Sequence, residues 1–211
     1  MSEMKITYHG HACFSVEAEG FCIVLDPCEN GTVPGLADLH LQAQQVLCSH
    51  EHHDHNGRDC VKLLPAKGET PFRMETLDVF HDDRQGALRG ANRIHVLSCG
   101  GLRLAHLGDL GHALSAEQVK SLGRLDAILI PVGGFYTVDA VMADRIAAQL
   151  GAPVVIPMHY RSGEIGYEVL GTAEEFLSLR KDICRSAESS FVLRENPSPV
   201  TLLLTPDHRK A

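Results

Sequence analysis

The chain has 211 residues, of which 44% are hydrophobic and 22% charged, and its formal net charge is −8. This composition is that of an ordinary globular protein and excludes a disordered chain. No apolar run approaches the roughly 20 residues of a membrane span, and the acidic balance argues against nucleic acid as a partner, because binding to a polyanion depends on Lys and Arg.

The length favours a single domain spanning residues 1–211. Residues 1–10 lack the basic and then apolar plan of a signal peptide, so we expect a cytoplasmic protein that contacts no membrane. The seven cysteines are scattered, odd in number and without a Cys-x-x-Cys pair, which indicates reduced thiols rather than disulfides or a structural zinc site. The expected partner is a small-molecule substrate, and self-association into a homo-oligomer stays open.

The first part of the chain is rich in predicted strands. Gly20 marks a hairpin turn, and an apolar run ends directly at His50, so the histidine-rich segment that follows leaves the end of a buried strand. In residues 56–68, apolar side chains lie three apart before Pro65, which predicts a short helix. The predicted strands of this part are 4–10, 12–18, 21–27 and 44–49.

Helices alternate with strands in the second part. Residues 115–123 predict a helix with Ser115 as its cap and Gln118 completing a capping box. Residues 137–151 have the clearest amphipathic pattern, with Thr137 as the expected cap. The other predicted elements are a helix near 172–181 and strands at 74–81, 93–99, 102–109, 125–134, 153–160 and 200–205. Several strands end at His or Asp, and such strand-end loops are where sites are usually built.

The segment HEHHDH, residues 50–55, gathers four imidazoles and two carboxylates. These are ligands that Zn²⁺ and other divalent transition metals prefer, and a metal also offsets the cost of placing carboxylates together in a partly buried site. In an extended segment His50 and His52 point to the same side and can bind one ion, while Asp54 and His55 face a second position. The segment therefore predicts halves of two metal sites, which need further ligands from elsewhere.

The same segment matches the His-x-His-x-Asp-His signature of the metallo-β-lactamase superfamily. Asp26 in IVLDP resembles the early strand-end aspartate of that superfamily, Asp109 in HLGDLG resembles its metal-bridging aspartate, and His159 in IPMHY resembles its last metal histidine. The start YHGHACFSV and the phrase PVGG look most like the branch that contains ascorbate-6-phosphate lactonase. The resemblance implies an α/β fold, a four-layer αβ/βα sandwich with a metal cleft at one edge of two facing sheets.

The resemblance also implies a role for each of these residues. His50, His52 and a third histidine would hold one metal, and Asp109 would bridge it to the other. Chain order favours His81 as the third histidine, with His106 as the alternative. The second metal would be held by Asp54, His55 and His159, with Asp26 orienting a ligand imidazole and with His11 and His106 near a ligand or the substrate.

Two divalent ions, most simply Zn²⁺ with Mn²⁺ or Fe²⁺ as alternatives, can activate a bridging hydroxide toward an ester, lactone or phosphodiester. Asp54 is the expected catalytic residue, since it can orient the hydroxide or pass a proton. We expect a small anionic substrate, with Arg84, Arg89 or Arg161 near the cleft as partners of its charge. Two other functions stay open: a mononuclear iron oxygenase or redox protein on the same fold, and a metal-binding protein without catalysis.

Overall fold

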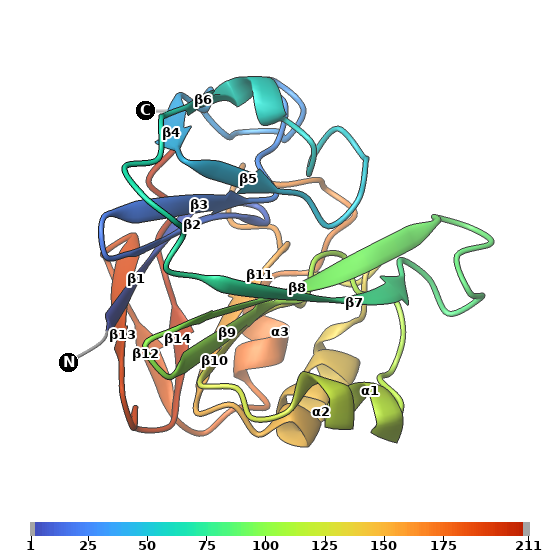
Figure 1. Ribbon diagram of the computed structural model, residues 1–211. Helices are drawn as coiled ribbons and strands as arrows, with labels where there is room; N and C mark the ends of the chain where they lie inside the picture. The colour runs from blue at the N-terminus through green and yellow to red at the C-terminus, as the bar shows by residue number, and fades with distance from the viewer. Residues whose placement is uncertain (1–2, 209–211) are drawn as a thin grey trace.

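Two β-sheets face each other across an apolar core, and α-helices pack on the outer face of the larger sheet (Figure 1). The computed structural model describes residues 3–208. The first sheet contains, in spatial order, β13 (Ser190–Arg194), β1 (Glu3–Gly10), β2 (Cys13–Ala18), β3 (Phe21–Leu25) and β5 (Gln45–Leu47). The second contains β12 (Ile183–Arg185), β14 (Val200–Leu203), β11 (Val154–Met158), β10 (Ala127–Pro131), β9 (Leu102–His106), β8 (Ala91–Cys99) and β7 (Arg73–Phe80). A small sheet pairs β4 (Leu41–Ala43) with β6 (Val61–Leu63).

The core between the two sheets follows from the alternation of side chains along each strand. In β2, Phe14 and Val16 point toward the second sheet and pack in one cluster with Leu129 of β10 and Ile156 of β11. Every residue of β10 and β11 is buried, because the opposite face of these strands, including Ile128, lies under the helices. Parallel strands covered on both faces are expected to be apolar throughout.

The first two α-helices begin directly after a residue whose side chain caps the helix. The α-helices are α1 (Ala116–Leu122), α2 (Ala140–Leu150) and α3 (Ala173–Leu177). The predicted capping box of Ser115 and Gln118 is confirmed at α1. The prediction of Thr137 as the cap of α2 was wrong, because the Asp139 carboxylate accepts a hydrogen bond from the Met142 N–H at 2.8 Å. Thr137 lies two residues earlier, in the preceding loop.

The prediction of a helix over residues 56–68 was also wrong. A single 3-10 turn, η1 (Arg58–Cys60), leads into β6, whose Val61 is buried against the outer face of the first sheet. Leu63 is 64% exposed, so the segment has no continuous apolar face that could hold a helix on the sheet. Within residues 3–208, the first sheet is covered by β4, β6 and η1, and the α-helices lie on the second sheet only.

Four short strands were not predicted: β4, β6, β12 and β13. The strand β13 extends the first sheet by pairing with β1, where Met4 lies opposite Leu193. Its half-buried residues do not alternate between apolar and polar, so its place in the sheet depends on tertiary pairing. None of the helices in residues 3–208 has the length and apolar character needed to cross a lipid bilayer.

Candidate metal centre

The residues predicted to form the site meet at one edge of the two sheets, where strands of both sheets end. Each lies directly after a strand or in the loop that follows it, so the sheets fix its position. In chain order these are His11 between β1 and β2, Asp26 after β3, residues 50–55 after β5, His81 after β7, Asp109 after β9 and His159 after β11.

The backbone at three of these positions lies in the left-handed region, which residues other than glycine rarely adopt. The φ angle is 55° at His11, 43° at Asp26 and 54° at His159. The His159 N–H donates to the carbonyl oxygen of His11 at 2.8 Å, and this hydrogen bond stabilises the turns at both residues. Strained backbone persists only where the surrounding structure enforces it, and it concentrates at functional sites.

The Asp109 carboxylate lies at the centre of the group. Its Oδ2 atom is 3.2 Å from Nε2 of His55, 3.2 Å from Nε2 of His81 and 3.1 Å from Nε2 of His159. The Asp109 N–H donates to Oδ1 of Asn92 at 3.0 Å, which fixes the turn. Burial alone would raise the pKa of Asp109, but the imidazoles of His159 and His55 outweigh burial and hold that pKa well below its ordinary value. Asp109 is therefore an ionised carboxylate shared by several imidazoles.

One group of candidate ligands near Asp109 consists of His50, His52 and His81. One ring nitrogen from each lies within 4.8 Å of the others. Burial is the main cause that lowers the pKa of His50 to about 3, so this imidazole is neutral at pH 7. A neutral imidazole is the form that binds a metal.

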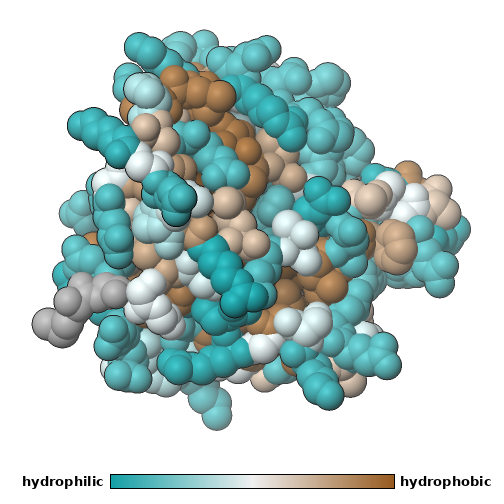
Figure 2. All heavy atoms as spheres, in the orientation of Figure 1, coloured by the Kyte–Doolittle hydropathy of each residue, from teal (hydrophilic) through white to brown (hydrophobic). Residues whose placement is uncertain are grey.

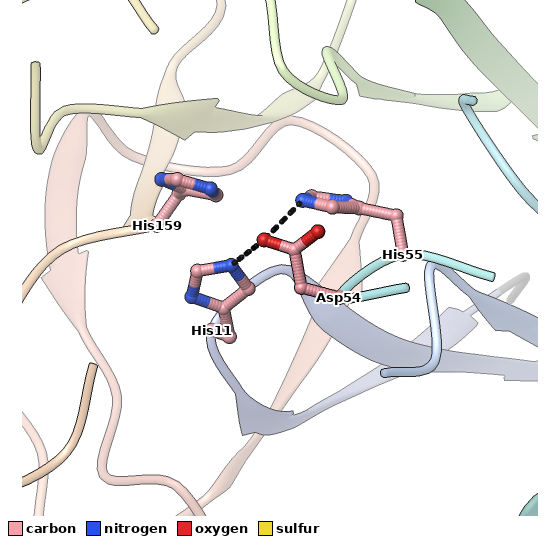
Figure 3. Close-up of side chains that lie close together, drawn as sticks. All are labelled: His11, Asp54, His55 and His159. Carbon is pink, nitrogen blue, oxygen red and sulfur yellow. Dashed lines mark hydrogen bonds and ion pairs between the residues drawn. The ribbon is translucent and has the colours of Figure 1, made fainter. Parts of the chain in front are cut away.

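A second group consists of His11, Asp54, His55 and His159 (Figure 3), and two of its imidazoles, His55 and His159, contact Asp109. Asp54 Oδ2 is 3.2 Å from His11 Nε2 and 3.8 Å from His55 Nε2. Burial would lower the pKa of His55, but Asp109 and Asp26 raise it well above its ordinary value. In the metal-free protein, the His55 imidazole is therefore protonated, and its positive charge compensates the carboxylates of Asp109 and Asp26. A bound metal cation would supply this compensation instead.

Several buried polar atoms of these groups have no hydrogen-bond partner among the described residues. A buried donor or acceptor without a partner costs free energy and needs an explanation. His55 Nε2 belongs to this set although it lies close to Asp109, because the two atoms do not have hydrogen-bond geometry. The atoms are Nε2 of His50, Nε2 of His55, both ring nitrogens of His159, Nδ1 of His11, Nδ1 of His81 and Oδ1 of Asp109. Nitrogen and oxygen atoms left open in this way fit a divalent metal.

Asp26 lies behind the two groups and is fully buried. Its carboxylate accepts hydrogen bonds from His55 Nδ1 at 2.8 Å and from the Ser49 hydroxyl at 2.5 Å. Ser49 Oγ is also 2.9 Å from Nδ1 of His50. Asp26 thus orients His55 directly and His50 through Ser49. The Nε2 atoms of both imidazoles are left facing Asp109. Sequence reasoning missed Ser49, although its place directly before His50 is a usable signal.

His106, the alternative third ligand, lies close by but has both ring nitrogens occupied. Nε2 donates to the carbonyl oxygen of Ala12 at 2.9 Å, and Nδ1 accepts from the Gly108 N–H at 3.1 Å. His95 similarly hydrogen-bonds through Nε2 to the carbonyl oxygen of Cys48 at 3.0 Å. The two imidazoles therefore join strands and turns behind the site.

A cleft of about 320 Å³ opens over the two groups. Its lining consists of His52, Asp54, His81 and Asp109 at the floor and Leu88, Arg89, Tyr136 and Tyr167 at the walls. The Arg89 guanidinium donates to the carbonyl oxygen of Phe135 at 2.9 Å and lies 5.7 Å from the ring centroid of Tyr136. Figure 2 shows apolar side chains among polar ones on the projecting loop between β7 and β8, where Leu88 is 58% exposed. The walls of the cleft thus combine one positively charged side chain with aromatic and aliphatic surface.

The loop between β7 and β8 is organised by the buried carboxylate of Asp82. It accepts hydrogen bonds from four backbone N–H groups, those of Arg84, Gly86, Leu88 and Arg89, at distances of 2.7–3.0 Å. Burial alone would raise the pKa of Asp82, but these four donors outweigh burial and lower the pKa to about 2. Because Asp82 follows His81 directly, the same turn positions a histidine of the floor and Arg89 of the wall.

The two facing sheets, with histidines and aspartates gathered at one edge, define the metallo-β-lactamase class of metal-dependent hydrolases. The chain belongs to this superfamily, since the model of the beta-lactamase superfamily domain matches residues 5–159. It is 30% identical over 188 residues to a UPF0173 metal-dependent hydrolase of Methanoculleus marisnigri, which covers 74% of this chain and 81% of the relative.

Solved structures agree with this assignment. The crystal structure of a Thermotoga maritima protein, named as a Zn-dependent hydrolase of the metallo-β-lactamase superfamily, matches with a TM-score of 0.74 and 32% identity over 95% of this chain and 98% of that chain. Igni18, a metallo hydrolase of Ignicoccus hospitalis, has a TM-score of 0.63 at 21% identity over 84% of this chain and 91% of that chain, which shows the fold alone. The predicted superfamily and its two-sheet fold are confirmed.

Proposed function

We propose that the chain is a binuclear hydrolase, most simply with zinc, that cleaves an ester, lactone or phosphodiester bond in a small anionic substrate. The observation that carries this proposal is the presence of two groups of candidate ligands, each of which contacts Asp109. Imidazole and carboxylate donors without cysteine suit zinc, with manganese or iron as the alternatives. Two bound ions would supply an activated water and neutralise charge on the leaving group.

The ligand sets follow from the two groups. One ion would be held by His50, His52 and His81, and the other by Asp54, His55 and His159, with Asp109 between them. His81 takes the third place in the first set because its ring lies beside His50 and His52, whereas both nitrogens of His106 are already occupied.

Asp54 is the residue best placed to act on the attacking water. It lies at the floor of the cleft, and its side chain is 17% exposed. Burial would raise the pKa of Asp54, but the hydrogen bond from His11 and the charge of His55 outweigh burial and lower it. The ionised carboxylate can accept a hydrogen bond from water and so orient it toward the substrate.

The walls of the cleft favour a small substrate with an anionic group. Arg89 uses one guanidinium nitrogen on the Phe135 carbonyl, and its other N–H groups can pair with a carboxylate or phosphate. Tyr136 and Tyr167 add aromatic surface for the body of the molecule. Of the other predicted arginines, Arg161 lines a different cleft.

Metal content per chain tests the proposal. We expect about two metal ions in protein purified without chelator or histidine tag, about one in His81→Ala, and an unchanged number in His106→Ala, measured by plasma mass spectrometry. One ion in both the wild type and His81→Ala would contradict the binuclear site. Turnover of lactones and phosphodiesters by the loaded wild type, with a raised KM for the anionic substrate in Arg89→Gln, tests the reaction and the role of Arg89.

A further inference from the structure

A second cleft, of about 490 Å³, lies at the carboxyl ends of three parallel strands, β11, β14 and β12. Arg161 follows β11, Arg185 ends β12 and Thr205 follows β14, so the same edge of the sheet brings all three side chains to this cleft. In α/β sheets, ligands bind preferentially outside the carboxyl ends of parallel strands. The two clefts have no lining residue in common.

The charge in the second cleft is incompletely compensated. Arg185 donates to both carboxylate oxygens of Glu174, at 2.7 and 2.6 Å, so this pair is neutral as a unit. The buried Nε of Arg161, in contrast, has no hydrogen-bond partner among residues 3–208. Arg161 also forms no ion pair within the described residues, so its positive charge at the cleft has no counter-charge, and an anion in the cleft would supply one.

The remaining lining suits a small organic anion better than an inorganic ion alone. The hydroxyls of Ser162 and Thr172 can donate neutral hydrogen bonds to a ligand, while Leu203 and Leu204 provide apolar wall. The volume lies within the range of small-molecule sites, about 300–1,000 Å³. We propose that this cleft binds a small organic anion, a carboxylate or a phosphate monoester, through Arg161. The proposal does not depend on the reaction at the metal centre.

A ¹H–¹⁵N NMR titration of the metal-loaded full chain with inorganic phosphate and, separately, with butyrate tests the proposal. We expect the amide signals of Gly163, Ser186 and Thr205 to shift along one saturating curve with at least one of the two probes. The probe that saturates identifies the class of anion. Arg161→Gln should weaken binding at least about tenfold, the loss expected for one charge-assisted hydrogen bond. Arg145→Gln, which removes an exposed arginine of α2, should leave the affinity unchanged.

A second variant covers the case in which Arg161→Gln fails to fold. Thr172 lines the cleft and its side chain makes no cap hydrogen bond to α3, so Thr172→Glu adds a carboxylate without removing such a contact. We expect this built-in anion to abolish binding of the probe. Three outcomes would overturn the proposal. The affinity could stay unchanged in either variant, or the shifts could be confined to the metal-centre loops. The third is that neither probe saturates up to about 50 mM, which would mean an affinity too weak for a built site.

Discussion

Histidine and aspartate side chains gather at two places in this molecule, the metal centre and the outer face of the first sheet. At the second place, His9 Nδ1 lies 2.9 Å from the Asp207 carboxylate and His9 Nε2 lies 2.9 Å from the Ser15 hydroxyl. His9 and Ser15 are only 5% and 6% exposed. The Asp207 N–H also donates to the carbonyl oxygen of Tyr8 at 3.2 Å, which ties Asp207 to β1.

The two places use the same residue types for different purposes. Ser15, His9 and Asp207 have the connectivity of a hydrolase triad, but a substrate cannot reach the buried Ser15 hydroxyl. Because both nitrogens of His9 have partners, His9 also has no ring atom open to a metal. At the metal centre, His159 is fully buried and both of its nitrogens are open. Open ligand atoms, rather than residue type or proximity, therefore separate a metal site from a structural hydrogen-bond chain.

The largest effect is expected from removing the central carboxylate of the metal centre. Asp109→Ala should lose metal and lower turnover by more than about 100-fold, because even partners behind a ligand are worth about 10–100-fold. Asp207→Ala, the matched change in the other cluster, should keep the full metal content and activity. Metal analysis and steady-state rates on the two variants check this, and metal loss from Asp207→Ala would remove the distinction between the clusters.

Removal of metal should also destabilise the protein through one cluster only. At a free metal concentration about 100 times the dissociation constant, binding adds about 2.7 kcal/mol to the free energy of unfolding. Chelation should therefore lower the melting temperature by roughly 5–10 °C for a chain of this size. His9→Ala should show the same drop on chelation as the wild type, measured by thermal unfolding with and without chelator. A smaller drop in His9→Ala would mean that the outer cluster binds metal as well.

A smaller effect is expected from the two serines, each of which contacts one histidine. Ser49→Ala removes the link between Asp26 and His50 and should weaken metal binding about 10–100-fold. Ser15→Ala should reduce the free energy of unfolding by about 1 kcal/mol, as expected for one hydrogen bond, without affecting metal affinity. Competition with a fluorescent chelator and urea unfolding separate these outcomes. Equal metal affinity in the wild type and Ser49→Ala would show that Ser49 does not orient His50.

Much of the fold and the grouping of the site could be predicted because local patterns determine them. The alternating strands of the first sheet and the capping box at Ser115 depend on neighbouring residues, and the structure has them where predicted. The strand β13 could not be predicted, because only its pairing with β1 makes it a strand. The helix over residues 56–68 failed for a related reason, since Val61 is buried by tertiary packing rather than on the apolar face of a helix.

The site also has a part that neighbouring residues determine and a part that depends on tertiary contacts. The segment 50–55 supplied most of the candidate ligands because adjacent positions determine which side chains can share an ion. The choice between His81 and His106 could not be derived from residue type, because it depends on hydrogen bonds to Ala12 and Gly108 that only the folded chain creates. Tyr136 and Tyr167 reach the cleft from loops distant in sequence, and no pattern in the chain pointed to Tyr136 or Tyr167.

The smallest effect is a difference in pH dependence between the clusters. Burial raises the pKa of Asp207, but hydrogen bonds from His9 and His208 outweigh burial and lower it below its ordinary value of 3.8. A carboxylate with a lowered folded pKa stabilises the protein above its unfolded pKa, and this stabilisation is lost as the pH falls through the folded pKa. In chelated protein, the difference in unfolding free energy between wild type and Asp207→Asn should shrink as the pH falls below about 4.

The size of that difference should be about 1 kcal/mol or less, because the Asp207 side chain is 32% exposed and solvent screens its interactions. As the pH falls, metal stabilisation should be lost before the Asp207 transition, because imidazole ligands must be neutral to bind and their ordinary pKa is about 6.5. Urea unfolding across this range, with and without chelator, separates the two transitions. A difference between wild type and Asp207→Asn that grew as the pH fell below about 4 would mean that the ionised carboxylate is not the stabilising partner of His9.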